Sequence, residues 1–87
     1  MNTKHVFTLD NLKIGRCCRI ISINNEESIR RRLLDLGLIP GTIIEAVLES
    51  PFKDPVAYKI NNATIAIRKC DSKNIIVEEL EWRRKLL

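Results

Sequence analysis

Aromatic residues are scarce in this sequence, which has one Trp, one Tyr and two Phe among its 87 residues. They are scattered over different parts of the chain. Small β-barrels that bind single-stranded nucleic acid stack the bases on aromatic side chains beside a basic groove. The net charge of +4 permits contact with nucleic acid, anionic lipid or an acidic protein surface. Without an aromatic platform we predict no nucleic-acid partner, and a small basic nucleic-acid-binding barrel is kept as an alternative function.

Side chains that bind transition metals are also few. The chain has one histidine, His5, and three cysteines, of which Cys17 and Cys18 are adjacent and Cys70 stands alone. Adjacent residues of a strand point to opposite faces, and no Cys-x-x-Cys or His-x-x-x-His spacing is present. We therefore predict no metal site and no cofactor.

Long hydrophobic runs and phosphate-binding loops are missing as well. No segment approaches the roughly 20 apolar residues that cross a bilayer, and residues 1–7 lack the apolar core of a signal peptide. There is no Gly-rich phosphate loop and no suggested nucleophile–base pair. These absences predict a cytoplasmic protein without stable membrane insertion that is not an enzyme.

Short segments rich in β-branched and apolar residues make up most of the chain. They predict strands over residues 16–23, 42–49, 56–60, 64–68 and 75–78. Five short strands with tight turns favour a small barrel, which removes exposed edges by closing on itself. We predict one mainly β domain over residues 1–87 with a core of about 8–78. Residues 79–87, which include Trp82, would form either a helical tail or a frayed end.

Residues 26–36 are the exception, because their apolar residues follow a helical period. Ile29, Leu33 and Leu36 fall on one face and are predicted to pack on the barrel. Asn25 is the predicted N-cap, and Gly37 is the residue at which the helix is expected to end.

The same helix carries the predicted partner-binding residues. Leu34 lies about 100° from the buried stripe, and together with Leu38 it would serve as an apolar anchor beside Arg30 and Arg31. Phe52, in a loop bracketed by two prolines, is predicted to be exposed and to join the same surface. The alternatives are a solvated helix face for the arginines, packing against the turn for both leucines, and a Phe52 folded over the barrel mouth.

Four ordered segments resemble the FeoA family of bacterial ferrous iron transport proteins. Residues Arg31–Thr42 resemble the family signature, and Leu9–Gly15 resemble its lead-in. Residues Ser50–Pro55 are similar to the family's Ala-Pro-Leu-Gly-Asp-Pro loop, and Ile65–Lys69 to its Leu-Ala-Leu-Arg-Lys strand. The resemblance extends over about residues 8–78, with Lys53 and Asn62 standing where the family often has glycine.

This resemblance implies a fold and a role. The fold would be an SH3-like barrel with one α-helix inserted after the first strand. The protein would be a cytosolic accessory protein that regulates ferrous iron uptake by contacting a FeoB-type membrane transporter, whose cytosolic part includes a GTP-binding domain. The resemblance implies no catalysis, and the family as a whole is described by the general term transition metal ion binding. Direct binding of ferrous iron, as in a sensor or chaperone, is therefore kept as a further alternative function. The sequence leaves weak self-association open.

Overall fold

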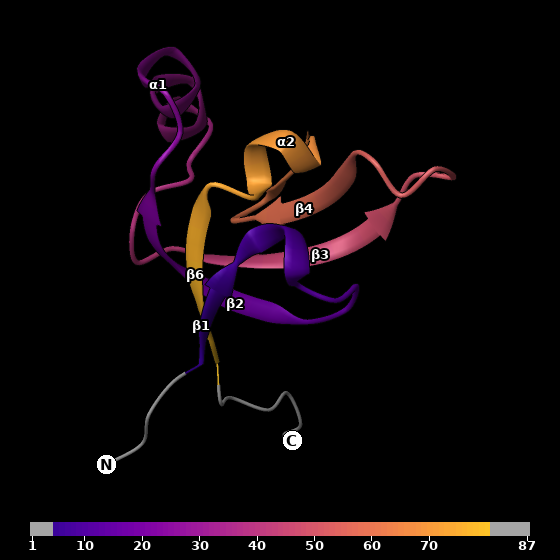
Figure 1. Cartoon of the computed structure of the whole chain (residues 1–87). Helices are drawn as coiled ribbons and strands as arrows, with labels where there is room; N and C mark the ends of the chain where they lie inside the picture. Colours follow the sequence, from indigo (N-terminus) through magenta and orange to yellow (C-terminus); the bar gives the residue numbers. More distant parts are fainter. Residues whose placement is uncertain (1–4, 81–87) are drawn as a thin grey trace.

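The computed structural model describes residues 5–80, and in this range the chain forms one antiparallel sheet of six strands in the order β1-β6-β2-β3-β4-β5. Figure 1 shows the strands curving around a common interior. The strands are β1 (Val6–Thr8), β2 (Cys17–Ile23), β3 (Ile43–Glu49), β4 (Val56–Ile60), β5 (Ala63–Ile67) and β6 (Ile75–Glu79). The helical elements are a 3₁₀-helix η1 (Leu9–Asn11), α1 (Glu27–Asp35) and α2 (Lys69–Ser72).

The predicted mainly β architecture is confirmed, with two corrections. β1 is a sixth strand, only three residues long, and it pairs with β6 from Val6↔Glu78 to Thr8↔Ile76. The inserted helix therefore follows the second strand of the chain. In addition, the ladder does not close into a ring within residues 5–80, because β1 and β5 lie at its two ends. The edge of β5 is therefore available for other contacts.

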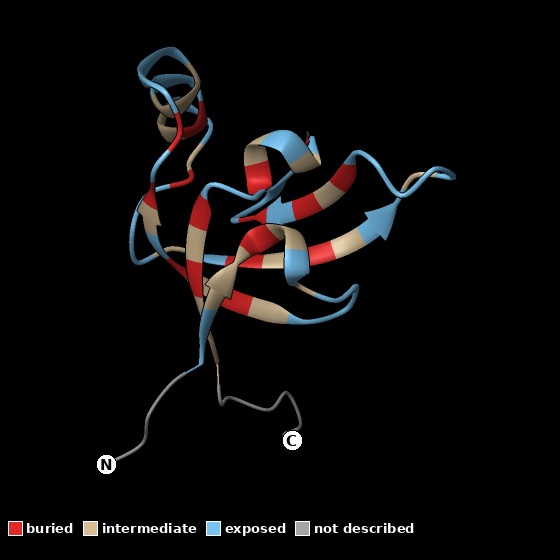
Figure 2. Cartoon of the chain, in the orientation of Figure 1, coloured by how far each residue is buried: buried red, intermediate tan, exposed pale blue. Residues whose placement is uncertain are grey.

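The core lies inside the curve of the sheet. Alternate residues of β2, β4 and β6 point inward, which gives the banded burial pattern along the strands in Figure 2. Leu9 of η1 enters the same core from the side. The fully buried side chains include Leu9, Cys18, Leu38, Ile44, Ala46, Ile75 and Val77.

Two irregularities in the sheet alter the simple alternation. In β2 the register with β6 shifts between Ile20 and Ser22, at a strand whose alternation is already imperfect in the sequence. In β3 the register with β4 shifts between Ala46 and Leu48. An extra residue in one strand turns the following side chains to the other face. Strict alternation along residues 42–49 predicts that Leu48 shares the inward face with Ile44 and Ala46. That prediction is wrong, because after the register shift Leu48 is 65% exposed.

The entry into α1 also differs from the prediction. The N-cap is Glu26, and its side chain makes no capping hydrogen bond. Asn25 is instead buried, and its Nδ2 donates to the carbonyl oxygen of Asp71 at 2.9 Å. The backbone N–H of Asn24 donates to the carbonyl of Asn74 at 2.9 Å in the same region. These bonds tie the start of α1 to α2 and its C-terminal turn.

Candidate interaction surface around the inserted helix

The outer face of α1 is basic and exposed. Arg31 pairs with Glu27 one turn earlier, with Nη2 and Oε2 3.3 Å apart, rather than with Asp35 as the spacing first suggests. Both partners of that pair are well exposed, so it contributes little to stability. Arg30 is half-buried and Arg32 is exposed. Because three consecutive residues spread over the helix circumference, these arginines face different directions.

Two predictions about which leucine is buried at the end of α1 are wrong. Leu36 was expected in the core but is 46% exposed, whereas Leu38 was expected at the surface but is fully buried. The helix ends at Leu36, and Gly37 adopts a φ of 105°. The Gly37 N–H donates to the Leu34 carbonyl and the Leu38 N–H to the Leu33 carbonyl, both at 3.0 Å.

This pair of bonds is a Schellman motif, in which the residue after glycine commonly packs on the last turn of the helix. The motif directs Leu38 inward beside Leu33, and both belong to the buried core. The prediction that Leu38 is an exposed partner-binding anchor is therefore wrong. Leu34, which was predicted to lie off the buried stripe as an apolar anchor, packs partly against the core and keeps some accessible surface.

Phe52 is 89% exposed, which confirms its predicted accessibility. Its loop is held at the base, where the Asp54 N–H donates to Ser50 Oγ at 3.0 Å and the Lys69 N–H donates to Asp54 Oδ1 at 2.9 Å. Lys53 has a φ of 69°, a region that glycine adopts more easily. Lys53 therefore adopts a backbone conformation that is more usual for glycine.

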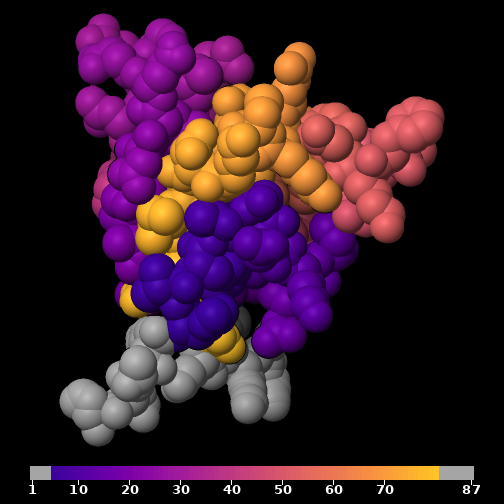
Figure 3. All heavy atoms as spheres, viewed as in Figure 1, coloured from indigo at the N-terminus to yellow at the C-terminus, as the bar shows by residue number. Residues whose placement is uncertain are grey.

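The structure does not bring the Phe52 loop and α1 together. Figures 1 and 3 show α1 and the loop between β3 and β4 as two projections at opposite upper corners of the molecule, with α2 between them. The predicted single surface is therefore two separate surfaces. Arg30, Arg31 and Leu34 belong to one, and Phe52 belongs to the other.

A groove that the sequence did not reveal lies between α1 and the β5–α2 segment, with a volume of about 550 Å³. Its apolar wall includes the exposed Leu36 and Ala66, and Arg32 and Arg68 bring positive charge. The outward position of Ala66 follows from strand alternation and can be predicted from the sequence. The position of Ala66 opposite Leu36 cannot be predicted in this way, because these residues are far apart in the chain. The lining residues are Ile29, Arg32, Leu33, Leu36, Pro55, Ala66, Ile67, Arg68, Cys70 and Asp71.

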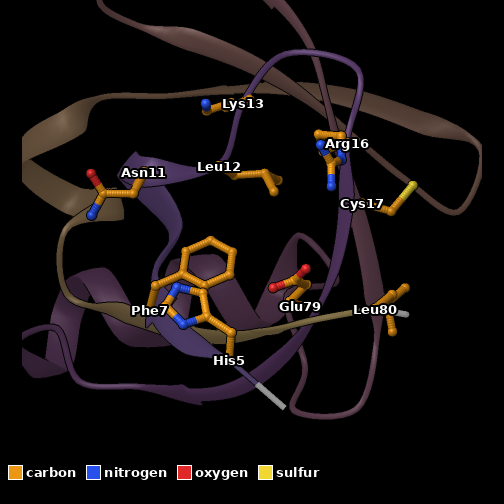
Figure 4. Close-up of a pocket in the computed structure, with 9 residues that line it drawn as sticks. All are labelled: His5, Phe7, Asn11, Leu12, Lys13, Arg16, Cys17, Glu79 and Leu80. Atoms are coloured by element: carbon orange, nitrogen blue, oxygen red, sulfur yellow. The ribbon is translucent and has the colours of Figure 1, made fainter. Parts of the chain in front are cut away.

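A second pocket, of about 570 Å³, lies where β1, the start of β2 and the end of β6 meet. In Figure 4 the His5 ring lies beside the Phe7 ring, and the Glu79 carboxylate points into the space between Phe7 and Leu80. The two rings stack with centroids 5.1 Å apart. Although His5, Cys17 and Glu79 all line this pocket, residues 5–80 contain no group of three His, Cys, Asp or Glu side chains placed to hold a metal ion.

The cysteines occupy different environments. Cys18 is in the core, and burial, with a smaller contribution from neighbouring Cys17, raises its pKa to about 12. A thiol with that pKa is protonated at neutral pH and is a poor metal ligand or nucleophile. Cys70 is exposed on α2. The absence of a metal site and of catalysis remains a prediction.

Sequence comparison identifies the family. The FeoA domain profile matches residues 7–79, which include every strand and helix described above except the first residue of β1. The chain belongs to the FeoA family. It is 31% identical over 70 residues to a fusion of Fe(2+) transport protein A with the Fe(2+) transporter FeoB from Porphyromonas gingivalis. That match includes 80% of this chain but only 8% of the fusion protein.

Solved FeoA structures share the fold. The FeoA protein of Chlorobium tepidum superposes with a TM-score of 0.81 at 31% identity, over 85% of this chain and 70% of that protein. The zinc complex of FeoA from Stenotrophomonas maltophilia, described as a prokaryotic SH3 domain protein, gives a TM-score of 0.73 at 24% identity, over 82% of this chain and 88% of that one. The fold is therefore SH3-like, and the family is associated with ferrous iron transport. Within residues 5–80, no helix has both the length and the apolar character needed to span a membrane.

Proposed function

We propose that this protein is a cytosolic accessory protein of ferrous iron uptake that binds the cytosolic part of a FeoB-type transporter. The observation that carries the proposal is the Porphyromonas gingivalis relative, in which a FeoA segment and a FeoB transporter form one polypeptide. Fusion keeps two domains at a high local concentration, so separate chains of the same families would need a binding surface instead. The exposed basic face of α1 is suited to that role.

The proposed mechanism is differential binding. A domain that binds one state of the transporter's GTP-binding domain more tightly shifts the equilibrium towards that state. On the α1 side the contact would use Arg30, Arg31 and the accessible part of Leu34. Phe52 would make a second contact, because its loop projects from the other corner of the molecule.

The test is a calorimetric titration of this protein with the purified cytosolic domain of the FeoB-type transporter from the same organism, with GDP and with a non-hydrolysable GTP analogue. Saturable binding that differs between the nucleotides is expected. Arg31→Glu should weaken it, whereas Arg16→Glu, at the opposite end of β2 from α1, should not. Phe52→Ala tests the second contact. The absence of saturable binding with either nucleotide would refute the proposed function.

A further inference from the structure

The groove beside α1 lies along an unpaired sheet edge. β5 is the last strand of the ladder, with β4 as its neighbour on one side only. At one end of α1, a Cβ on Gly37 would lie 3.7 Å from Cγ2 of Ile60, the last residue of β4 before the turn into β5. At the other end, Asn25 is bonded to Asp71 of α2, just after β5 ends. These contacts place α1 next to the segment that runs from the end of β4 to α2, and Ala66 and Ile67 of β5 line the groove together with residues of α1.

The helix shields this edge without filling the space beside it, because a groove of about 550 Å³ remains between the two elements. β4 and β5 are joined by a two-residue turn and pair from Ile60↔Ala63 to Val56↔Ile67. In such a hairpin the closing pair is hydrogen-bonded and the pairs then alternate. We therefore expect the backbone N–H and C=O groups of Thr64 and Ala66 to point away from β4, towards the open edge.

Positive charge exceeds negative charge around the groove. Arg32 of α1 and Arg68, the residue after β5, contribute positive charge, and Asp71 is the acidic residue that lines the groove. Neither arginine takes part in an ion pair within residues 5–80, where the ion pairs are Arg31–Glu27 and Arg19–Glu78. The side chain of Leu36 adds an exposed apolar contact.

We propose that this groove binds an extended, acidic segment of a partner protein, which adds a strand to the edge of β5. Strand addition uses backbone hydrogen bonds for affinity and flanking side chains for specificity, and the groove offers an open edge, two uncompensated arginines and an apolar contact. The acidic segment would come from the cytosolic part of the FeoB-type transporter, and this assignment rests on the proposed function. A second copy of this chain is a poorer occupant, because symmetric pairing would bring Arg32 and Arg68 close to their own copies.

The recognition itself is tested by NMR with a synthetic peptide of alternating valine and glutamate. This peptide should shift the amide resonances of residues 63–68 and 29–36 and slow hydrogen exchange at Thr64 and Ala66. The Arg32→Glu/Arg68→Glu variant should lose affinity by about tenfold or more. The matched Lys13→Glu/Arg16→Glu variant, with the same charge change at the other pocket, should bind normally. A peptide with lysine in place of glutamate should not bind.

Several results would overturn the proposal. Equal binding of the acidic and basic peptides, or shifts on α1 without slower exchange at Thr64 and Ala66, would exclude acidic strand addition. A dimer in sedimentation velocity that the acidic peptide dissociates would identify a second copy as the occupant. Far-ultraviolet circular dichroism confirms that each variant is folded.

The transporter domain separates this inference from the proposed function. Binding that is weakened by Arg32→Glu/Arg68→Glu supports both. Binding that is unaffected supports the proposed function and overturns the groove as its site. Peptide binding in the groove without any binding of the transporter domain supports the recognition chemistry and overturns the assignment of its source.

Discussion

Substitution of Leu36 and of Leu38 by alanine should have very different effects on stability. The two variants therefore test directly which of these side chains is buried at the end of α1. Leu38 is fully buried, whereas Leu36 is 46% exposed. Shortening a fully buried leucine to alanine removes its contacts and leaves a cavity, which costs about 2–5 kcal/mol. Shortening an exposed leucine normally changes the free energy of unfolding by about 0.5 kcal/mol or less.

The size of the Leu38 effect is large for a domain of this length. Natural domains are stable by about 0.05–0.15 kcal/mol per residue, or roughly 4–13 kcal/mol for 87 residues. Leu38→Ala would therefore remove a substantial part of the total, and a loss of 2 kcal/mol alone would lower Tm by at least roughly 8 °C. Leu36→Ala should leave Tm within a few degrees of the unmodified protein.

The assay is urea unfolding followed by far-ultraviolet circular dichroism. For Leu38→Ala the midpoint should fall while the slope with urea stays unchanged, because the same surface is exposed on unfolding. Leu36→Ala should leave the urea midpoint unchanged. It should lower the affinity for the acidic peptide, since Leu36 lines the groove. An equal or larger loss of stability for Leu36→Ala would refute the inward direction of Leu38 after Gly37.

Three further predictions concern the rest of the molecule. Asn25→Ala removes the 2.9 Å hydrogen bond to Asp71 and should cost about 1–2 kcal/mol of unfolding free energy in urea; no loss would show that this bond does not hold α1 to α2. Burial raises the pKa of the Tyr58 phenol from 10.0 to about 12, so the folded state retains a proton that the unfolded state releases. Stability should therefore fall between pH 10 and 12, by up to about 1.4 kcal/mol per pH unit for this group. Burial also raises the pKa of Cys18 from 9.0 to about 12, so this thiol lowers stability as the pH rises between these values. Tyr58→Phe should make the decline in stability from pH 10 to 12 shallower, and an unchanged decline would refute the Tyr58 contribution. Finally, Glu27→Ala removes the exposed pair with Arg31 and should change stability by about 0.5 kcal/mol or less, whereas a loss above about 1 kcal/mol would mean that the pair is part of a larger network.

Local patterns in the sequence determined the elements. Segments rich in β-branched and apolar residues located β2 to β6 to within a residue or two, because such side chains favour an extended backbone. The end of α1 at Gly37 followed from the left-handed φ that glycine adopts without strain. The four segments that resemble the family also pointed to the FeoA fold.

Only the tertiary structure decided how those elements face one another. The three residues of β1 are too few to show a period, and their pairing with β6 is long-range. The reversal of Leu36 and Leu38 depends on the backbone turn after α1, and the exposure of Leu48 depends on a bulge in its ladder with β4. Separation of the Phe52 loop from α1, and the approach of α1 to β5, depend on how the whole sheet curves. Local periodicity fixes which side of an element is apolar, but contacts between residues far apart in the chain decide what that side meets.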